Sequence, residues 1–143
     1  MRYTSGGLLS GLALAALCCG GATAQTIAVG GKSFTEQQIM TAMTVSVLKA
    51  KGFAPDRKAG MGSAAVRAAL ENAQIDVYWE YTGTALTVYH KISDKFPTAE
   101  DAYRKLKEVD AAKGLVWLNM SAVNNTYALA MNKEDAQKRG IAL

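Results

Sequence analysis

The sequence contains few of the residues that build disulfides, metal sites and catalytic centres. Among its 143 residues there are two cysteines and one histidine, His90. Cys18 and Cys19 both lie in an N-terminal apolar stretch, so the chain from Gln25 onwards has no thiol. A zinc site or a histidine-based triad needs several partners, and no nucleophile is paired with a base. We therefore predict no catalytic residue, no metal, no cofactor and an exposed His90.

Positive charge is present but is not gathered into one run. The net charge is +4, and the lysines and arginines occur in small groups among polar or acidic neighbours. A nucleic-acid surface needs a concentrated basic face, so we expect no nucleic-acid partner. The segment GGKS lacks the upstream glycine of a phosphate-binding loop, which argues against ATP binding.

The N-terminal residues have the pattern of a secretory signal peptide. Arg2 is followed by an uncharged apolar run at 8–19 and then by Ala22 and Ala24 in an A-x-A arrangement. The run is short for a membrane span, which needs about 20 residues. We predict a signal peptide over 1–24 and export to the periplasm. An uncleaved anchor, or lipid modification at Cys18 or Cys19, remains open.

Short apolar runs alternate with helical patterns along the rest of the chain. This alternation predicts an α/β fold with a mainly parallel sheet flanked by helices. The expected strands are 26–30, 53–58, 74–79, 115–118 and 126–131. The expected helices are 35–51, 63–72, 82–91, 99–113 and 133–139.

Local signals support the first two of these helices. Thr35 and Gln38 have the spacing of a capping box, and Gly52 suits the position after the helix end. Ser63 is expected to cap the second helix, and Thr98 and Asn132 are expected to cap the last two helices. A stripe of Ile39, Met43 and Val47 is expected to pack the first helix inward.

Ligands of open α/β sheets bind beyond the carboxyl ends of the strands. Three segments are expected there, namely GGKSFTEQQ, AGMGS and EYTGT. Free N–H groups at helix N-termini suit carboxylates, while aromatic faces suit quaternary ammonium groups. Tyr81 lies past the expected strand end, so we predict that it faces the ligand. Tyr78 and Trp79 are expected to pack.

Three longer stretches carry a resemblance to a known family. VGGKSFTEQ, AGMGSAAVRAALENAQIDVYWEYTGTAL and GLVWLNMSAVNNTYALAM resemble the substrate-binding component of glycine betaine/choline/carnitine ABC importers, which serve osmoprotectant uptake. The resemblance implies a type II periplasmic-binding-protein fold with two lobes. Two lobes need roughly 100–150 residues each, so the sequence looks truncated. Residues 25–122 would form the first lobe, and 123–143 the crossover and the beginning of the second.

The resemblance also implies a set of ligand-binding residues. Tyr81 and Tyr127 would belong to an aromatic cage, Thr84 would contact the ligand carboxylate, and Gln37 would be a polar neighbour. Each residue also has a structural interpretation. The tyrosines suit half-buried strand ends, Thr84 suits a helix N-cap and Gln37 suits a solvated first turn. Trp79 stands where many relatives have proline, which puts the local strand geometry in doubt.

The function implied is capture of a small zwitterion or quaternary amine outside the cytoplasm. The expected partners are that ligand and a membrane permease with its ATPase. A second hypothesis is a ligand-sensing module without transport, or a remnant half-domain of a solute-binding protein. An enzyme is a third, and the sequence offers no catalytic pattern for it.

Overall fold

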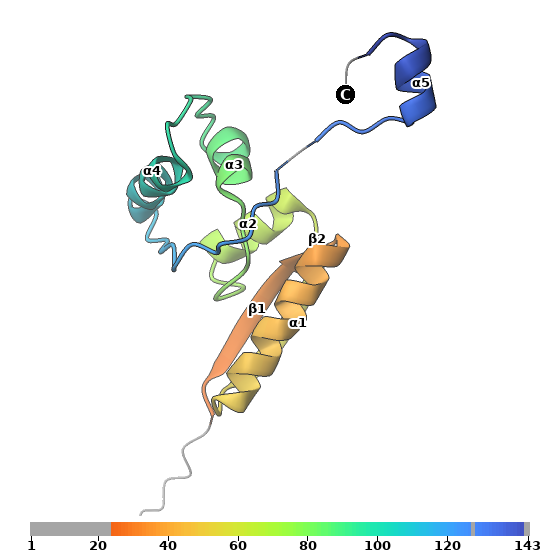
Figure 1. Cartoon of the computed structure of the whole chain (residues 1–143). Coiled ribbons are helices and arrows are strands. Elements are labelled where there is room, and N and C mark those ends of the chain that lie inside the picture. The colour runs from red at the N-terminus through yellow and green to blue at the C-terminus, as the bar shows by residue number, and fades with distance from the viewer. Residues whose placement is uncertain (1–23, 127, 142–143) are drawn as a thin grey trace, which may run out of the picture. The chain divides into compact units, whose positions relative to one another are not determined.

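The chain divides into two compact units after Tyr78 in a computed structural model that describes residues 24–126 and 128–141 (Figure 1). Residues up to Tyr78 are called unit 1 here, and those from Trp79 are called unit 2. The predicted signal peptide, apart from Ala24, and Tyr127 lie outside the described residues. The predicted lobe boundary near residue 122 stays a prediction.

Unit 1 is built on a parallel pair of strands. Strand β1 (Thr26–Lys32) pairs with β2 (Ala54–Met61), with Thr26 opposite Ala54. The register shifts between Gly30 and Lys32, near the carboxyl end of β1. The expected first strand is confirmed, and the second continues three residues further than expected.

The third expected strand, 74–79, is present only as a single parallel bridge. Val77 pairs with Val29 on β1. The Val77 carbonyl accepts a hydrogen bond from Gly30 N at 2.8 Å. Asp76 N donates to the Ala28 carbonyl at 2.8 Å, and its carboxylate accepts from Ala28 N at 2.7 Å. The segment therefore lies along the edge of β1 that β2 leaves open.

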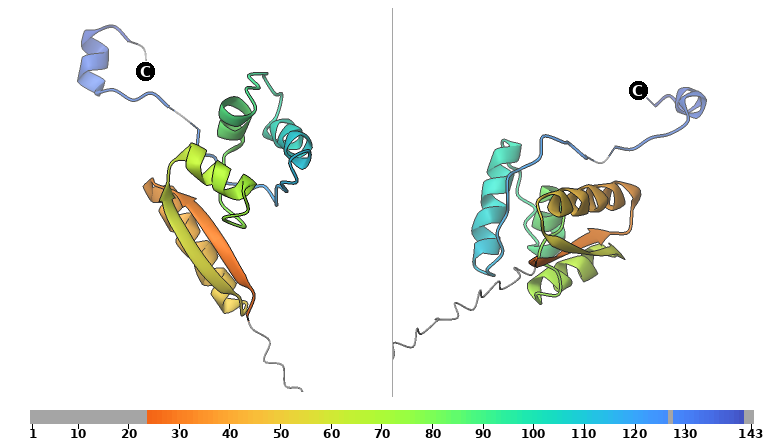
Figure 2. Two further views of the ribbon diagram at one scale, coloured as in Figure 1. Left: turned by 180° about the vertical axis from the view of Figure 1, so that it is seen from behind. Right: turned by 90° about the horizontal axis from the view of Figure 1, so that it is seen from below.

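Helices α1 (Thr35–Ala50) and α2 (Ser63–Glu71) cover opposite faces of this sheet (Figure 2). The two glycines of β1 show why both helices approach closely. A Cβ on Gly30 would meet Ile75, just after α2, at 2.3 Å and Val66 of α2 at 3.2 Å, and one on Gly31 would meet Thr41 of α1 at 2.2 Å. Successive residues of a strand point to opposite faces, so each glycine makes room for one helix.

The predicted side-chain caps of these helices are wrong. The N-caps are Phe34 and Gly62, and neither forms a side-chain capping bond. Both cap residues have extended backbones, so Thr35 and Ser63 are already the first helical residues. Gly52, at φ +87°, follows the C-cap of α1, which confirms its predicted place.

The predicted inward stripe on α1 is also wrong. Ile39, Met43 and Val47 are 55%, 62% and 58% exposed. The buried face instead carries Gln37 and Thr41, each 0% exposed. The Thr41 hydroxyl lies within 2.7 Å of the Gln37 carbonyl, to which it donates. Both polar side chains also bond to the backbone of β1, Thr41 to the Gly30 carbonyl at 3.3 Å and Gln37 to Lys32 N, so they face the sheet.

Unit 2 is mainly helical. It contains α3 (Thr82–Thr84), the π-helix η1 (Ala85–Tyr89), α4 (Ala99–Ala111) and α5 (Lys133–Lys138). Its core is formed by Ala85, Leu86 and Leu106. The predicted caps Thr98 and Asn132 are confirmed, since both side chains accept backbone N–H groups.

The strands expected at 115–118 and 126–131 are not formed by the described residues of those segments. Val116 is 80% exposed, and Leu118 is exposed as well. A strand needs a neighbouring strand for its hydrogen bonds, and the described part of the chain supplies none there. No helix in residues 24–126 and 128–141 is both long and apolar enough to cross a membrane.

Candidate ligand-binding site

The carboxyl ends of β1 and β2 lie at the same edge of unit 1 because the two strands are parallel. Gln37 lies at this edge, where its side-chain oxygen accepts from Lys32 N at 3.3 Å. Gln38 donates its side-chain amide to the Lys32 carbonyl at 2.9 Å. Two glutamines of the first turn of α1 therefore hold the last residue of β1. A ligand contact by Gln37 stays a prediction.

Lys32 itself was given no role from the sequence. Lys32 is only 2% exposed, and lysine is rarely buried to this extent. No periodic pattern indicates this burial, since Lys32 follows a glycine pair in an expected loop. The signal available was its place at the carboxyl end of the first strand, beside the two glutamines.

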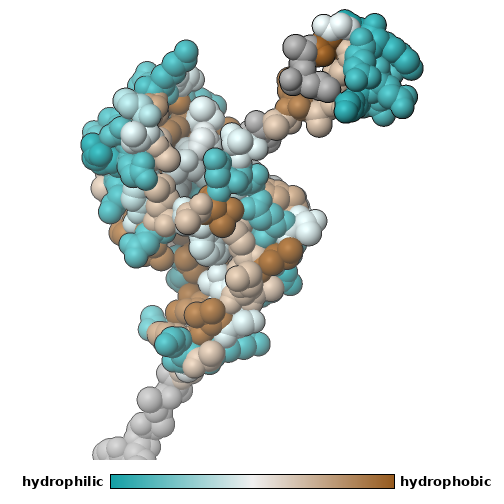
Figure 3. All heavy atoms as spheres, in the orientation of Figure 1, coloured by the Kyte–Doolittle hydropathy of each residue, from teal (hydrophilic) through white to brown (hydrophobic). Residues whose placement is uncertain are grey.

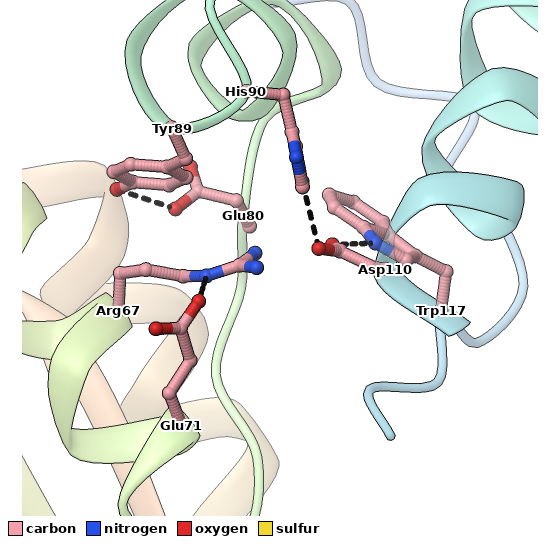
Figure 4. Close-up of polar contacts among 7 residues, drawn as sticks. All are labelled: Arg67, Glu71, Glu80, Tyr89, His90, Asp110 and Trp117. Carbon is pink, nitrogen blue, oxygen red and sulfur yellow. Dashed lines mark hydrogen bonds and ion pairs between the residues drawn. The ribbon is translucent and has the colours of Figure 1, made fainter. Parts of the chain in front are cut away.

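Tyr81 is held by its backbone at the entrance to unit 2. It is the N-cap of α3, and its carbonyl accepts from Ala85 N at 2.9 Å. Its N–H donates to the carboxylate of Glu80 at 2.8 Å. The other oxygen of that carboxylate accepts from the Tyr89 hydroxyl at 3.0 Å (Figure 4). Glu80 thus fixes the start of α3 to the end of η1.

The side chains of Tyr81 and Thr84 are both partly buried. The hydroxyl oxygen of Tyr81 is itself shielded from solvent. Thr84 ends α3 and forms no side-chain capping bond to η1, so its interpretation as an N-cap is wrong. Gly83 between them is exposed, with no heavy atom within 4 Å of a Cβ built on it. A ligand could therefore approach the backbone at Gly83.

The predicted aromatic partner of Tyr81 cannot be placed beside it. Tyr127 lies outside the described residues, so the aromatic cage stays a prediction. Tyr78 packs against the core of Val66, Ala69 and Ile75 in unit 1, as expected. Trp79 remains 39% exposed, so its predicted packing is incomplete.

A buried carboxylate in unit 2 was not found from the sequence. Asp110, 1% exposed, lies 2.7 Å from His90 Nε2 through one oxygen. Its other oxygen accepts from Trp117 Nε1 at 2.6 Å (Figure 4). The predicted exposure of His90 is wrong because its side chain is turned onto this carboxylate. His90 and Asp110 are 20 residues apart, and no sequence spacing indicates such a contact.

Charged groups of unit 1 form local pairs. Arg67 is buried on α2 and contacts Glu71 one turn later at 2.7 Å (Figure 4). Across residues 24–126 and 128–141, no group of three or more histidine, cysteine, aspartate or glutamate side chains is arranged to hold a metal ion. The described residues thus offer a candidate site built from aromatic, hydroxyl and backbone groups.

Comparisons with known proteins define the class to which this fold and site belong. Residues 25–142 match the family described as the substrate-binding domain of the ABC-type glycine betaine transport system. Apo YehZ from Escherichia coli superposes with a TM-score of 0.67 at 29% identity, over 82% of this chain and 43% of that one. The chain therefore has the periplasmic-binding-protein fold, as predicted.

The chain belongs to this family of substrate-binding domains. It is 48% identical over 131 residues to a glycine-betaine-binding protein of Pseudomonas aeruginosa, which covers 91% of this chain and 42% of the relative. Escherichia coli YehZ, a glycine betaine-binding protein, is 30% identical over 80% of the chain and 39% of its own length. The Helicobacter pylori ergothioneine transport permease/ergothioneine binding protein EgtU is 35% identical over 80% of the chain and 21% of its length.

The chain spans about two fifths of the P. aeruginosa and E. coli relatives. The resemblance stated from the sequence motifs is confirmed. The roles of Tyr81, Thr84, Tyr127 and Gln37 stay predictions.

Proposed function

We propose that this chain is part of an extracytoplasmic substrate-binding protein of an ABC importer. Its ligand would be glycine betaine or a related quaternary amine, and its role would be uptake of osmoprotectants. The match of residues 25–142 to the glycine betaine substrate-binding family carries this proposal. The 48% identity to a glycine-betaine-binding protein supports the ligand class.

The chemistry of the candidate residues suits such a ligand. A trimethylammonium group has no N–H to donate, so aromatic faces recognise it by cation–π attraction. In this proposal Tyr81 and Tyr127 supply those faces, and Thr84 supplies a hydroxyl for the carboxylate. Glu80 holds the Tyr81 backbone through its N–H. Choline and carnitine carry the same trimethylammonium group and are included in the proposed class.

The proposed contact of Tyr81 with the ligand can be tested in a single-chain chimera. Residues 25–142 of this chain replace the matched segment of the P. aeruginosa relative, and calorimetry follows titration with glycine betaine, choline and proline. We expect binding of the quaternary amines and none of proline. Tyr81→Ala should raise Kd roughly 2- to 30-fold, the worth of one aromatic face.

Tyr81→Phe is the matched control, because it keeps the ring and removes only the hydroxyl. It should bind nearly as tightly as the parent chimera. Unchanged affinity in Tyr81→Ala would show that Tyr81 is not part of the cage. Equal binding of proline and glycine betaine would contradict the proposed ligand class.

The proposal places the protein in the periplasm, with a permease and its ATPase as partners. The signal-peptide pattern over 1–24 and the name of the family support this placement. The family and the P. aeruginosa and E. coli relatives are named for binding, so we propose that the chain is not an enzyme. Turnover in a hydrolase screen would contradict that.

A further inference from the structure

The π-helix η1 follows directly on the turn that carries Tyr81 and Thr84. His90 N donates to the Ala85 carbonyl at 3.2 Å, five residues back, where an α-helix would bond four residues back. The extra residue in this turn shifts Tyr89 around the helix axis from the place that an α-helix would give it. Single π-turns of this kind are frequent at functional sites. The position of the Tyr89 side chain therefore depends on η1.

The ring of Tyr89 is anchored in the core of unit 2. It packs against Ala85, Leu86 and Leu106. Leu106 comes from α4, which contacts η1 and whose exposed charged residues form the hydrophilic surface of this part of unit 2 in Figure 3. The hydroxyl at the far end of the ring donates to the carboxylate of Glu80 at 3.0 Å (Figure 4). Tyr89 thus links the core of unit 2 to Glu80.

Glu80 passes this anchorage on to Tyr81 through its second carboxylate oxygen. Its Oε2 accepts from the Tyr89 hydroxyl, and its Oε1 accepts from the Tyr81 N–H at 2.8 Å. Hydrogen bonds to a carboxylate are stronger than those between neutral groups. The backbone of Tyr81 is therefore held in one conformation before a ligand arrives. Groups that are already held bind more tightly, because less conformational freedom is lost on binding.

We propose that Tyr89, acting through Glu80, is a positioning residue for the turn at 81–84. This role rests on the proposed function, in which that turn presents Tyr81 and Thr84 to a quaternary amine. Tyr89 itself contacts no ligand in this arrangement. Its hydroxyl keeps the Tyr81 backbone in place, and through it the direction in which the Tyr81 ring is presented. The rival interpretation is a hydroxyl that stabilises unit 2 without affecting the ligand.

Amide hydrogen exchange of the full chain, followed by NMR without ligand, tests whether Tyr89 holds Tyr81. Tyr89→Phe keeps the ring in the core and removes only the hydroxyl. We expect exchange of the Tyr81 N–H to become at least about threefold faster, because Glu80 loses one of its anchors. Tyr103→Phe is the matched control, because it removes a hydroxyl of α4 that donates to the Leu118 carbonyl. It should leave exchange at Tyr81 unchanged.

Two substitutions of Glu80 test the hydrogen-bonded route from Tyr89 to Tyr81. Glu80→Gln keeps an oxygen that can accept the Tyr81 N–H and gains an amide that can donate to the Tyr89 hydroxyl, whereas Glu80→Ala keeps neither partner. We expect exchange at Tyr81 in Glu80→Gln to stay within about twofold of the parent, and to be at least about threefold faster in Glu80→Ala. Equal acceleration by both substitutions would overturn this route.

Calorimetry in the chimera tests whether the held turn matters to the ligand. We expect Tyr89→Phe to raise the Kd of glycine betaine at least about threefold, and Tyr103→Phe to leave it within about twofold of the parent. In a Tyr81→Ala background, Tyr89→Phe should have almost no further effect, because it acts through Tyr81. A hydroxyl with a purely structural role would change the Kd by the same factor in both backgrounds, or in neither.

The two measurements fail in different ways. Unchanged exchange at Tyr81 in Tyr89→Phe would overturn the proposal, as would faster exchange with an unchanged Kd. Equal effects of Tyr89→Phe in the parent and Tyr81→Ala backgrounds would overturn it in favour of a structural hydroxyl. If the parent chimera bound no quaternary amine, the proposed function would fail, and exchange at Tyr81 would still decide whether Tyr89 holds the turn.

Discussion

Two adjacent glycines decide how the sheet of unit 1 is covered. Gly30 and Gly31 point to opposite faces of β1, and a Cβ on either would meet a side chain of a covering helix. From the sequence, the pair was interpreted as the end of a strand. Its packing role depends on Val66 and Thr41, which lie far along the chain, and no local pattern identifies them.

Gly31→Ala should lower the free energy of unfolding by about 1–3 kcal/mol, as overpacking does. The new Cβ would lie 2.2 Å from Thr41 Oγ1 and 3.2 Å from Thr41 Cβ, so α1 would have to move. Chemical denaturation followed by circular dichroism measures the change. Gly83→Ala is the control, because open space surrounds Gly83 and its helical backbone in α3 suits alanine. Equal stability of the two variants would contradict the packing argument.

Elements with strong local signals were predicted well from the sequence. Strand β1 has an apolar run, and α4 begins at the Thr98 cap. Elements that depend on contacts with distant parts of the chain were not predicted well. The segment at 115–118 has an apolar strand pattern, yet no strand forms there in the described residues. The contacts of Asp110 with His90 and Trp117 were missed for the same reason.

Asp110 connects α4 to the residue after η1 and to the segment after α4. Asp110→Ala should destabilise unit 2 by about 1–3 kcal/mol for each buried donor left without an acceptor. Thermal unfolding monitored by tryptophan fluorescence measures the loss. Glu108→Ala serves as the control, because its pair with Lys105 is exposed and such pairs contribute little. If both variants had the same unfolding midpoint temperature as the parent, the Asp110 contacts would not stabilise the unit.

At the scale of the whole molecule, the sequence motifs identified the family and the shortness of the chain. They could not show which residues meet in a site, because a cage depends on how distant segments are placed. Tyr81 and Thr84 are close in sequence, whereas Tyr127 lies outside the described residues. Local motifs were therefore enough to identify the family, whereas the site depends on contacts between distant segments.

The chain alone should bind glycine betaine at least about tenfold more weakly than the chimera described above. Two-lobed binding proteins close around the ligand, and a chain that spans 42% of a relative lacks much of the enclosing surface. Calorimetry on both proteins under the same conditions measures the difference. If the chain alone, as a monomer, bound glycine betaine as tightly as the chimera, the part of the chimera taken from the relative would contribute nothing to ligand binding.

The exposed apolar side of α1 also affects how long the protein persists in a cell. Chaperones and proteases continuously remove proteins that display apolar surface. A form of the protein in which Ile39, Met43 and Val47 stay exposed would be held at a lower steady-state abundance than a form in which they are covered. The abundance of the protein in the cell would then depend on whether one face of α1 is covered.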